Sequence, residues 1–381
     1  MKRKILGALA AVALMASAGH AAAQSKEPLK LPFPYIFSGP LIEFGERVWN
    51  EGLLPGVAKV NAAGGIHGRP LEFYKVDVRF PETAPWISEF RRLCADQNIP
   101  IIFGVGATKS LLAIYEETGK CKIPVFNPSS GGHWPHKDFA DWIFRYQPMP
   151  ADVMPTLLQK AKDDLGIKNV ALTFTLDDEF AVNNANVSRR VIKEMGLNLV
   201  TEQSFKTKET NFASQVAAIR AAKPDAVVMH HQPGDAGTLL LQLRERGVEA
   251  PVITDTIVGG ADFWKLSKGG AKGSIGFSLY NVDDPRPAVQ EWVALWRKNT
   301  GKAEAAPDGF VTAYYDGVQV LAHVLNNAKD LSRAAIRESF LTVKGMDTIS
   351  GTIEWDGVGD VRRPAPILVQ VGDNGKLRQW K

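Results

Sequence analysis

The stretch "PIIFGVGATKSLLAIYEETGKCKIPVF", residues 100–126, determines the fold expected for this chain. The apolar run at 100–103 predicts a strand, residues 108–118 have the spacing of an amphipathic helix, and residues 123–126 predict a second strand. A strand, a helix and a strand in succession indicate a right-handed crossover between parallel strands. The stretch therefore predicts an α/β fold.

The same alternation extends in both directions from this stretch. Before it, the pattern predicts strands over 32–37 and 71–78 and helices over 44–62 and 84–96. After residue 150, it predicts helices over 151–164, 179–195, 212–222 and 235–246 and strands over 169–174, 199–204, 226–230 and 251–253. Helices over 287–299, 308–327 and 332–342 precede two strand-like segments, "TISGTIEW" and "PILVQV". Two α/β units in series are the simplest interpretation.

The glycines that follow the strand at 100–103 resemble a nucleotide-binding turn. A P-loop needs glycine directly before Lys109, where this chain has Thr108, and the dinucleotide fingerprint needs its third glycine at Lys109 itself. What remains is a strand end, two glycines and a helix that begins at Thr108 with unpaired backbone N–H groups. The turn is then either an anion-binding site or an ordinary turn in which Thr108 caps the helix.

The N-terminus has the pattern of a secretory signal peptide over residues 1–23. Three basic residues precede an apolar run, and the triplet Ala21-Ala22-Ala23 predicts cleavage after Ala23. The apolar run is shorter than the about 20 residues that a membrane span needs, so we expect a protein that is exported and not embedded in the membrane. With no lipobox cysteine near the cut, the pattern favours the periplasm of a Gram-negative bacterium.

Charge, cysteines and motifs exclude several classes of protein. Residues 1–23 hold three of the 45 basic residues, so the rest, with 42 basic and 41 acidic residues, carries a formal charge of +1 and gives no basic surface for nucleic acid. There is no GxSxG, HExxH or CxxC motif, so we expect no enzyme, no metal site and no cofactor. Cys94 and Cys121 either form a disulfide, which the periplasm permits, or remain two small buried thiols.

The segment 127–150, "NPSSGGHWPHKDFADWIFRYQPMP", has no helical period and is rich in proline, glycine and aromatic residues. Such a composition is typical of a linker or of a ligand-binding loop. Its two histidines, His133 and His136, are too few for a metal site of three or four donors.

Four segments together resemble one known family. "FSGPLIEFG", "VAKVNAAGGIHGRPLEFYKVD", "FGVGATKSLLAIYEETGKCKIPVFNPSS" and "AKGSIGFSLY" are similar, in order and spacing, to the periplasmic solute-binding proteins of the Leu/Ile/Val-binding type. These are the extracytoplasmic receptors of branched-chain amino-acid ABC transporters. The resemblance covers nearly the whole chain after the signal peptide, and residues 61–69 are its most specific element.

The resemblance implies a clamshell of two doubly wound parallel-sheet lobes joined by three crossover segments. Lobe 1 would comprise residues 24–148 and 281–355, and lobe 2 residues 149–280 and 356–381. The solute would bind between the lobes, outside the carboxyl ends of the strands, and hinge closure would trap it. Monomer is the norm of this family.

On lobe 1 the resemblance implies that two turns hold the carboxylate of the solute. These are Ala107-Thr108 and Ser129-Ser130-Gly131, where Gly131 replaces the usual threonine. Hydroxyls and the positive end of a helix suit a carboxylate. Phe44 matches a position at which relatives often place an aromatic wall, although a core phenylalanine is the alternative.

On lobe 2, Phe180 falls where many relatives have a tyrosine that closes over the solute. Gln232, with His231 beside it, follows one strand, and Asp255 and Thr256 follow the next. Amino-acid-binding relatives place an acid at the position of Thr256 to pair with the α-ammonium group, so the acid of this chain is one residue out of register. If Asp255 points into the cleft, an amino acid fits; if it does not, the solute is a carboxylate without an amine.

The resulting expectation is a non-catalytic periplasmic receptor that binds a small carboxylate solute and delivers it to the membrane permease of an ABC transporter. An apolar amino acid is the family default, and an aromatic or short organic acid is the alternative. Two other classes, a ligand sensor and a two-domain α/β enzyme, are the competing hypotheses.

Overall fold

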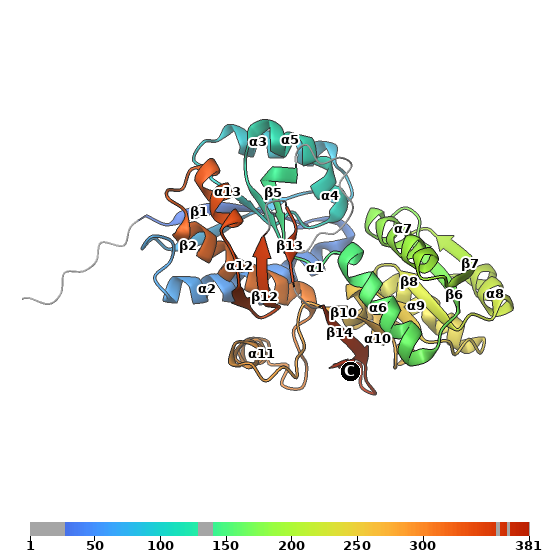
Figure 1. The fold of residues 1–381 in the computed structure, drawn as a ribbon. Helices are drawn as coiled ribbons and strands as arrows, with labels where there is room; N and C mark the ends of the chain where they lie inside the picture. The colour runs from blue at the N-terminus through green and yellow to red at the C-terminus, as the bar shows by residue number, and fades with distance from the viewer. Residues whose placement is uncertain (1–26, 129–139, 356–358, 364–365, 381) are drawn as a thin grey trace, which may run out of the picture.

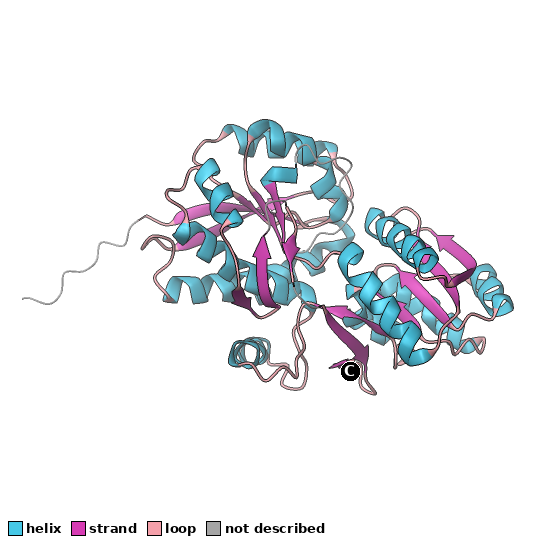
Figure 2. Cartoon of the chain, in the orientation of Figure 1, coloured by secondary structure: helices cyan, strands magenta, loops and turns pink. Residues whose placement is uncertain are grey.

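The computed structural model describes residues 27–128, 140–355, 359–363 and 366–380. They form two α/β lobes set side by side, with the short helix α4 of one lobe facing α7 of the other (Figure 1). Helices cover the sheets of both lobes (Figure 2). The α/β class with two lobes rich in parallel strands is confirmed.

The first lobe, called lobe 1 below, is built on parallel strands. Strand β1 pairs with β2, the strands β3, β4 and β5 pair in that order, and β1 lies against β3. These strands are β1 (Leu29–Tyr35), β2 (Leu71–Asp77), β3 (Ile102–Phe103), β4 (Val125–Asn127) and β5 (Ile143–Arg145). A small antiparallel sheet joins them, with β11 (Met346–Thr348), β12 (Gly351–Trp355) and β13 (Val361–Arg362).

The helices of lobe 1 come from both halves of the chain. They are α1 (Ile42–Arg47), α2 (Leu54–Ala62), α3 (Ala84–Ala95), α4 (Thr108–Ala113), α5 (Tyr115–Cys121), α11 (Pro287–Thr300), α12 (Gly309–Asn327) and α13 (Arg333–Leu341). The helix expected over 44–62 is one continuous helical run, in which a π-helical segment, Val48–Leu53, joins α1 to α2. The helix expected over 108–118 is divided at Ile114 into α4 and α5.

The second lobe, lobe 2, is built on one seven-stranded sheet in the order β15-β14-β10-β9-β8-β6-β7. The strands are β6 (Asn169–Thr175), β7 (Asn198–Phe205), β8 (Ala226–His230), β9 (Val252–Thr254), β10 (Ile275–Ser278), β14 (Ile367–Val371) and β15 (Leu377–Gln379). Those from β6 to β10 pair in parallel, while β14 and β15 are antiparallel. The helices are α6 (Pro150–Leu165), α7 (Glu179–Glu194), α8 (Ala213–Ala222), α9 (Pro233–Glu245) and α10 (Ala261–Leu266).

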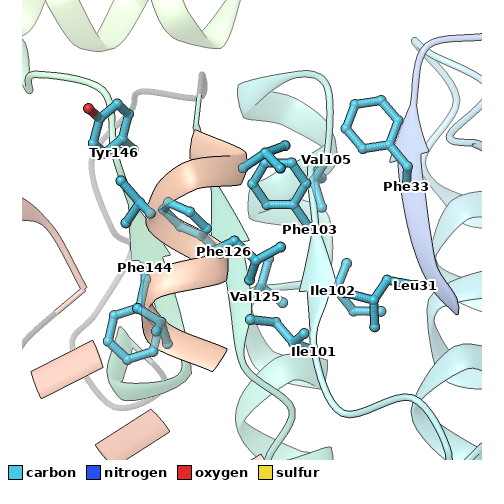
Figure 3. Packing of buried hydrophobic residues seen from close by; sticks show 14 of the residues in the cluster. Leu31, Phe33, Ile101, Ile102, Phe103, Val105, Val125, Phe126, Phe144 and Tyr146 are labelled. Carbon is cyan, nitrogen blue, oxygen red and sulfur yellow. The ribbon is translucent and has the colours of Figure 1, made fainter. Parts of the chain in front are cut away.

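Each lobe has its own hydrophobic core, so each can hold the ends of its strands in fixed positions. In lobe 1 the strands β1, β3, β4 and β5 bury aliphatic and aromatic side chains between the helices (Figure 3). Phe103 packs against Phe126 with ring centroids 5.4 Å apart, and Phe144 stacks on Phe340 at 4.1 Å. Separate clusters fill the two faces of the sheet of lobe 2.

The chain passes between the lobes three times. It leaves lobe 1 after β5, returns after β10, and leaves again after β13 (Figure 1). The last passage comes later than the boundary expected at 355/356, because β13 pairs with β12 and Asp360 bridges to Arg145 at the end of β5. The bidentate pair of Arg145 with Asp360, at 2.5 and 2.6 Å, holds this segment on lobe 1.

Cys94 and Cys121 are joined by a disulfide, with Cα atoms 6.0 Å apart. The bond links the end of α3 to the end of α5 and so fixes the helix pair beside the turn at 104–108. Of the two alternatives that the sequence leaves open, the structure has the disulfide.

The expected signal peptide, residues 1–23, lies outside the described residues. Among the residues that are described, no helix combines the length and apolar character needed to cross a membrane.

Candidate ligand-binding site

The turn that follows β3 is held in place from three sides. Asn127, at the end of β4, donates both amide hydrogens, to the carbonyl oxygens of Gly104 (2.6 Å) and Val105 (2.7 Å), and the Val105 N–H donates to the Pro34 carbonyl (2.6 Å). Gly104 has a φ of 127°, which favours glycine, and a Cβ on Gly106 would lie 2.8 Å from the Tyr35 ring. The turn is therefore a rigid support for the start of α4.

Thr108 is the first residue of α4 and is 7% exposed. Ala107 precedes it in extended conformation as the N-cap, and its own side chain makes no capping hydrogen bond. The first turn of α4 holds no acidic residue, and Lys109 is exposed. The backbone N–H groups and the Thr108 hydroxyl are thus grouped at a helix start without a competing carboxylate.

Phe44, on α1, fits both of the roles that the sequence leaves open. Its ring stacks on Tyr35 (6.0 Å between centroids) and meets Phe310 edge to face (5.3 Å), so it is part of the lobe 1 core. It is nevertheless half-buried, and the guanidinium of Arg47 lies 5.6 Å from its centroid. Arg47 in turn pairs with Asp308.

The second turn expected on lobe 1, Ser129-Ser130-Gly131, lies outside the described residues, as do His133, Trp134 and His136. Their part in a site stays a prediction.

On lobe 2 the start of α7 is joined to the start of α9. Asp178 caps α7 by accepting from the Phe180 N–H (2.9 Å), and its other oxygen accepts from the Gln232 side chain (2.7 Å). Burial raises the pKa of Asp178, against the opposing effect of these hydrogen bonds. Phe180 is half-buried against the core of lobe 2, and Gln232 is exposed at the N-cap of α9.

Asp255 is not open to a ligand in this structure. Its side chain is fully buried, and its Oδ2 accepts from Asn184 Nδ2 (2.9 Å) and lies 2.8 Å from His230 Nδ1. Its Oδ1 accepts from the Ile257 N–H (3.1 Å), which caps the short helix Thr256–Gly259. The opposite ring nitrogen of His230 lies 2.8 Å from the Ser188 hydroxyl, so the carboxylate is one member of a closed polar network.

The side chain of His231 makes its contacts within lobe 2. Its ring is fully buried between the hydroxyls of Thr173 and Thr175, each 2.9 Å from one ring nitrogen, and stacks on Phe205 at 4.4 Å. Burial, and then the neighbouring His230, lowers the pKa of His231 well below its ordinary value. This residue supports the sheet and does not reach the space between the lobes.

Thr256 meets the first crossover segment. Its hydroxyl lies 3.3 Å from the Nε2 of Gln147, two residues beyond β5, and Gln147 is 2% exposed. Within the described part of the chain, the Oε1 of Gln147 has no hydrogen-bond partner. Gln147 was not expected as a site residue, because one glutamine in an irregular segment carries no sequence signal.

Two contacts connect the elements of the two lobes that carry expected site residues. α4 and α7 are in contact between the lobes (Figure 1), and the side chain of Gln147, in the first crossover segment, contacts the hydroxyl of Thr256. We call this set of residues, Phe44, Ala107, Thr108, Gln147, Phe180 and Thr256, the interlobe site.

Comparison with known proteins identifies the family of this chain. Residues 28–376 match the family model described as periplasmic binding protein. The chain belongs to the periplasmic binding protein family.

Relatives of this periplasmic binding protein include the Leu/Ile/Val-binding protein homolog 7 of Brucella abortus (strain 2308), which is 25% identical over 89% of this chain and 86% of its own. A leucine binding protein, LivK, from Thermotoga maritima superposes with a TM-score of 0.80 at 18% identity, over 92% of this chain and 97% of its own. The branched-chain amino acid transporter substrate binding protein LivJ from Streptococcus pneumoniae, solved with isoleucine, gives 0.78 at 20% identity, over 92% and 98%. These are substrate-binding proteins and not enzymes.

A metal site and a solute site on the outer surface are not supported by the described residues of this binding protein. The described residues contain no group of three or more His, Cys, Asp or Glu side chains that could hold a metal ion. A shallow, open hollow on the outside of α6 is lined by Pro155, Thr156, Gln159, Lys160, Asp163, Asp164 and Met195. None of these residues follows a strand, and the charged Lys160, Asp163 and Asp164 among them suit solvent better than a trapped solute.

Proposed function

We propose that this protein is the periplasmic substrate-binding protein of an ABC transporter and that it captures a small solute with a carboxylate group between its lobes. Membership of the periplasmic binding protein family and the leucine and isoleucine named for its structural neighbours support this function. A permease in the membrane would then accept the solute from the closed protein.

The observation that carries the proposal is the start of α4. Thr108 and the first N–H groups of α4 would bind the carboxylate, on a turn that Asn127 holds in place. The partial positive charge of a helix start and a hydroxyl favour a carboxylate without the bulk of a cationic side chain. Phe44 and Phe180, one from each lobe, would enclose the apolar part of the solute.

Closure follows from contacts that both lobes make with one solute. A ligand shifts a protein toward the closed form only by binding that form more tightly. The approach of α4 to α7 and the contact of Gln147 with Thr256 support a site that both lobes would share. Solute binding should therefore stabilise the arrangement described here.

The Thr108→Ala variant tests the carboxylate contact. Loss of one hydroxyl from a buried charge should weaken solute binding by about 1 to 3 kcal/mol, which is roughly 5- to 150-fold. The solute is found by a thermal-shift screen over amino acids and organic acids, and its affinity is then measured by calorimetry. Thr352→Ala makes the same chemical change on exposed β12 and should leave binding unaltered. Full affinity in Thr108→Ala would refute the proposed contact.

Transport is tested separately from binding. Deletion of the gene should abolish high-affinity uptake of the solute, and the wild-type protein should restore it. A deletion strain that keeps normal uptake but loses a response to the solute would favour a sensor over a transport receptor.

A further inference from the structure

The carboxylates of lobe 2 differ in how many of their oxygens already accept hydrogen bonds within the protein. This limits which charged groups of a solute they can bind. A zwitterionic amino acid brings an ammonium group that must be paired when it is buried, because an unpaired buried charge is strongly unfavourable. The acidic side chains that follow the strands of lobe 2 are therefore decisive.

Asp255 is the acid nearest to Thr256 along the chain, and it is fully engaged. Three protein groups, from Asn184, His230 and Ile257, bind its two oxygens, and no part of the side chain is exposed. To pair with a solute, Asp255 would have to leave a buried network and the cap of the helix that follows it. The geometry therefore assigns Asp255 to the structure of lobe 2.

Asp178 and Asp235 are the other acids to consider. Both oxygens of Asp178 already accept hydrogen bonds, from the start of α7 and from Gln232. Burial raises the pKa of Asp235, and its backbone hydrogen-bond donor is Lys208, just beyond the edge strand β7. That strand is at the opposite edge of the sheet from β14 and β15, whereas Thr256 follows β9. The Oδ2 of Asp235 has no hydrogen-bond partner among the described residues, so Asp235 is set apart from Thr256 by its place in the sheet.

Among the described residues, two groups near the hinge have buried polar atoms without a hydrogen-bond partner. One is the neutral amide of Gln147, and the other is the guanidinium of Arg363, which lies 4.5 Å from the ring centroid of Tyr146. Gln147 is buried, its Nε2 contacts the Thr256 hydroxyl, and its Oε1 has no partner among the described residues. The two ends of an amide can be exchanged by a flip, but in either orientation one polar atom stays unsatisfied. A hydroxyl or a carbonyl group of a solute can satisfy it, since a hydroxyl both donates and accepts and a carbonyl accepts.

We propose that Gln147 and Thr256 bind an uncharged hydroxyl or carbonyl group of the solute, so that this protein takes a hydroxy or keto carboxylic acid in preference to an amino acid. The inference rests on the proposed function, in which Thr108 and α4 hold the carboxylate on the neighbouring carbon of the solute. An ammonium group could donate to the same amide oxygen, but both oxygens of Asp255 and of Asp178 already accept hydrogen bonds. The positive charge would also lie close to the guanidinium of Arg363 on Tyr146, the residue before Gln147. Discrimination against the amine of about 100-fold or more is expected on this ground.

Calorimetry on the full chain with matched compounds tests the inference. One set is L-leucine, 2-hydroxy-4-methylpentanoate and 4-methyl-2-oxopentanoate, and the other is L-phenylalanine, 3-phenyllactate and phenylpyruvate. Within a set the carboxylate and the side chain are the same and only the second polar group changes. We expect the hydroxy or the keto acid of at least one set to bind about 100-fold more tightly than its amino acid.

The outcomes separate this inference from the proposed function. An amino acid that binds as tightly as its hydroxy and keto analogues, or more tightly, overturns the inference and leaves the carboxylate function intact. The absence of binding by all six compounds contradicts both.

Two variants that add an acid at the hinge provide the second test. Thr256→Glu, or the nearly isosteric Gln147→Glu if the first does not fold, should reverse the preference by raising amino-acid affinity at least about 10-fold relative to the hydroxy acid. Asp163→Glu, on exposed α6, is the control and should not change the preference. If Asp255→Asn, folded by circular dichroism, abolishes amino-acid binding in the otherwise wild-type protein, Asp255 pairs with the amine and the inference is wrong.

Discussion

Removal of the Asp255 carboxylate should severely destabilise lobe 2, because three buried donors depend on it. In Asp255→Ala the side chains of Asn184 and His230 and the N–H of Ile257 lose their acceptor. Each buried donor left unsatisfied costs about 1 to 3 kcal/mol, and loss of one partner of a buried pair costs about 3 to 5 kcal/mol. Since the remaining groups can rearrange together, we expect a loss of about 3 to 5 kcal/mol in the free energy of unfolding.

Urea unfolding followed by circular dichroism at pH 7 measures this loss. Asp163→Ala is the matched control, because it removes an exposed aspartate from the same lobe and should change the free energy of unfolding by about 0.5 kcal/mol or less. Asp255→Ala with a loss below about 1 kcal/mol would refute the reasoning, since such a value is typical of an aspartate that faces solvent or a ligand.

Two further predictions concern the stability of the separate lobes. The disulfide closes a loop with a sequence separation of 27 in lobe 1. The Cys94→Ser, Cys121→Ser double variant should therefore lose about 3.5 kcal/mol in the free energy of unfolding, as measured by urea unfolding. An unchanged free energy of unfolding after reduction of the wild-type protein would contradict this. Because the pKa of His231 is lowered by folding, the unfolded chain binds a proton that the folded one does not once the pH falls below about 6.5. The free energy of unfolding should then fall by up to about 1.4 kcal/mol per pH unit in acid, and His231→Gln should remove this contribution to the pH dependence. If the free energy of unfolding depends equally on pH in both proteins, His231 is not held as a buried neutral side chain.

The alternation of strands and helices was predictable because it depends on local patterns. The runs at 100–103 and 123–126 became β3 and β4, and the glycine turn between them leads into α4 at Thr108, as the sequence indicates. β5 was not predicted, because its three residues stand in an irregular segment and become a strand only by pairing with β4. The third passage between the lobes was misplaced for a similar reason, since the two residues of β13 are defined by their partner β12.

The site was only partly predictable, because its chemistry depends on contacts between distant residues. The sequence places Asp255 and Thr256 after a strand, but whether the carboxylate is free depends on Asn184 and His230, which are 71 and 25 residues away. Likewise, the role of Gln147 depends on a hydroxyl that lies 109 residues further along the chain. Positions at strand ends can be inferred from a pattern, while the satisfaction of their hydrogen bonds cannot.

The most direct test of the account is a crystal structure of this protein with the solute that binds best in the calorimetric comparison. The account predicts the carboxylate at Thr108 and the start of α4, a hydroxyl or carbonyl group at Gln147 and Thr256, and Asp255 still bound to His230. A solute held outside the interlobe site, or an ammonium group paired with Asp255, would contradict it.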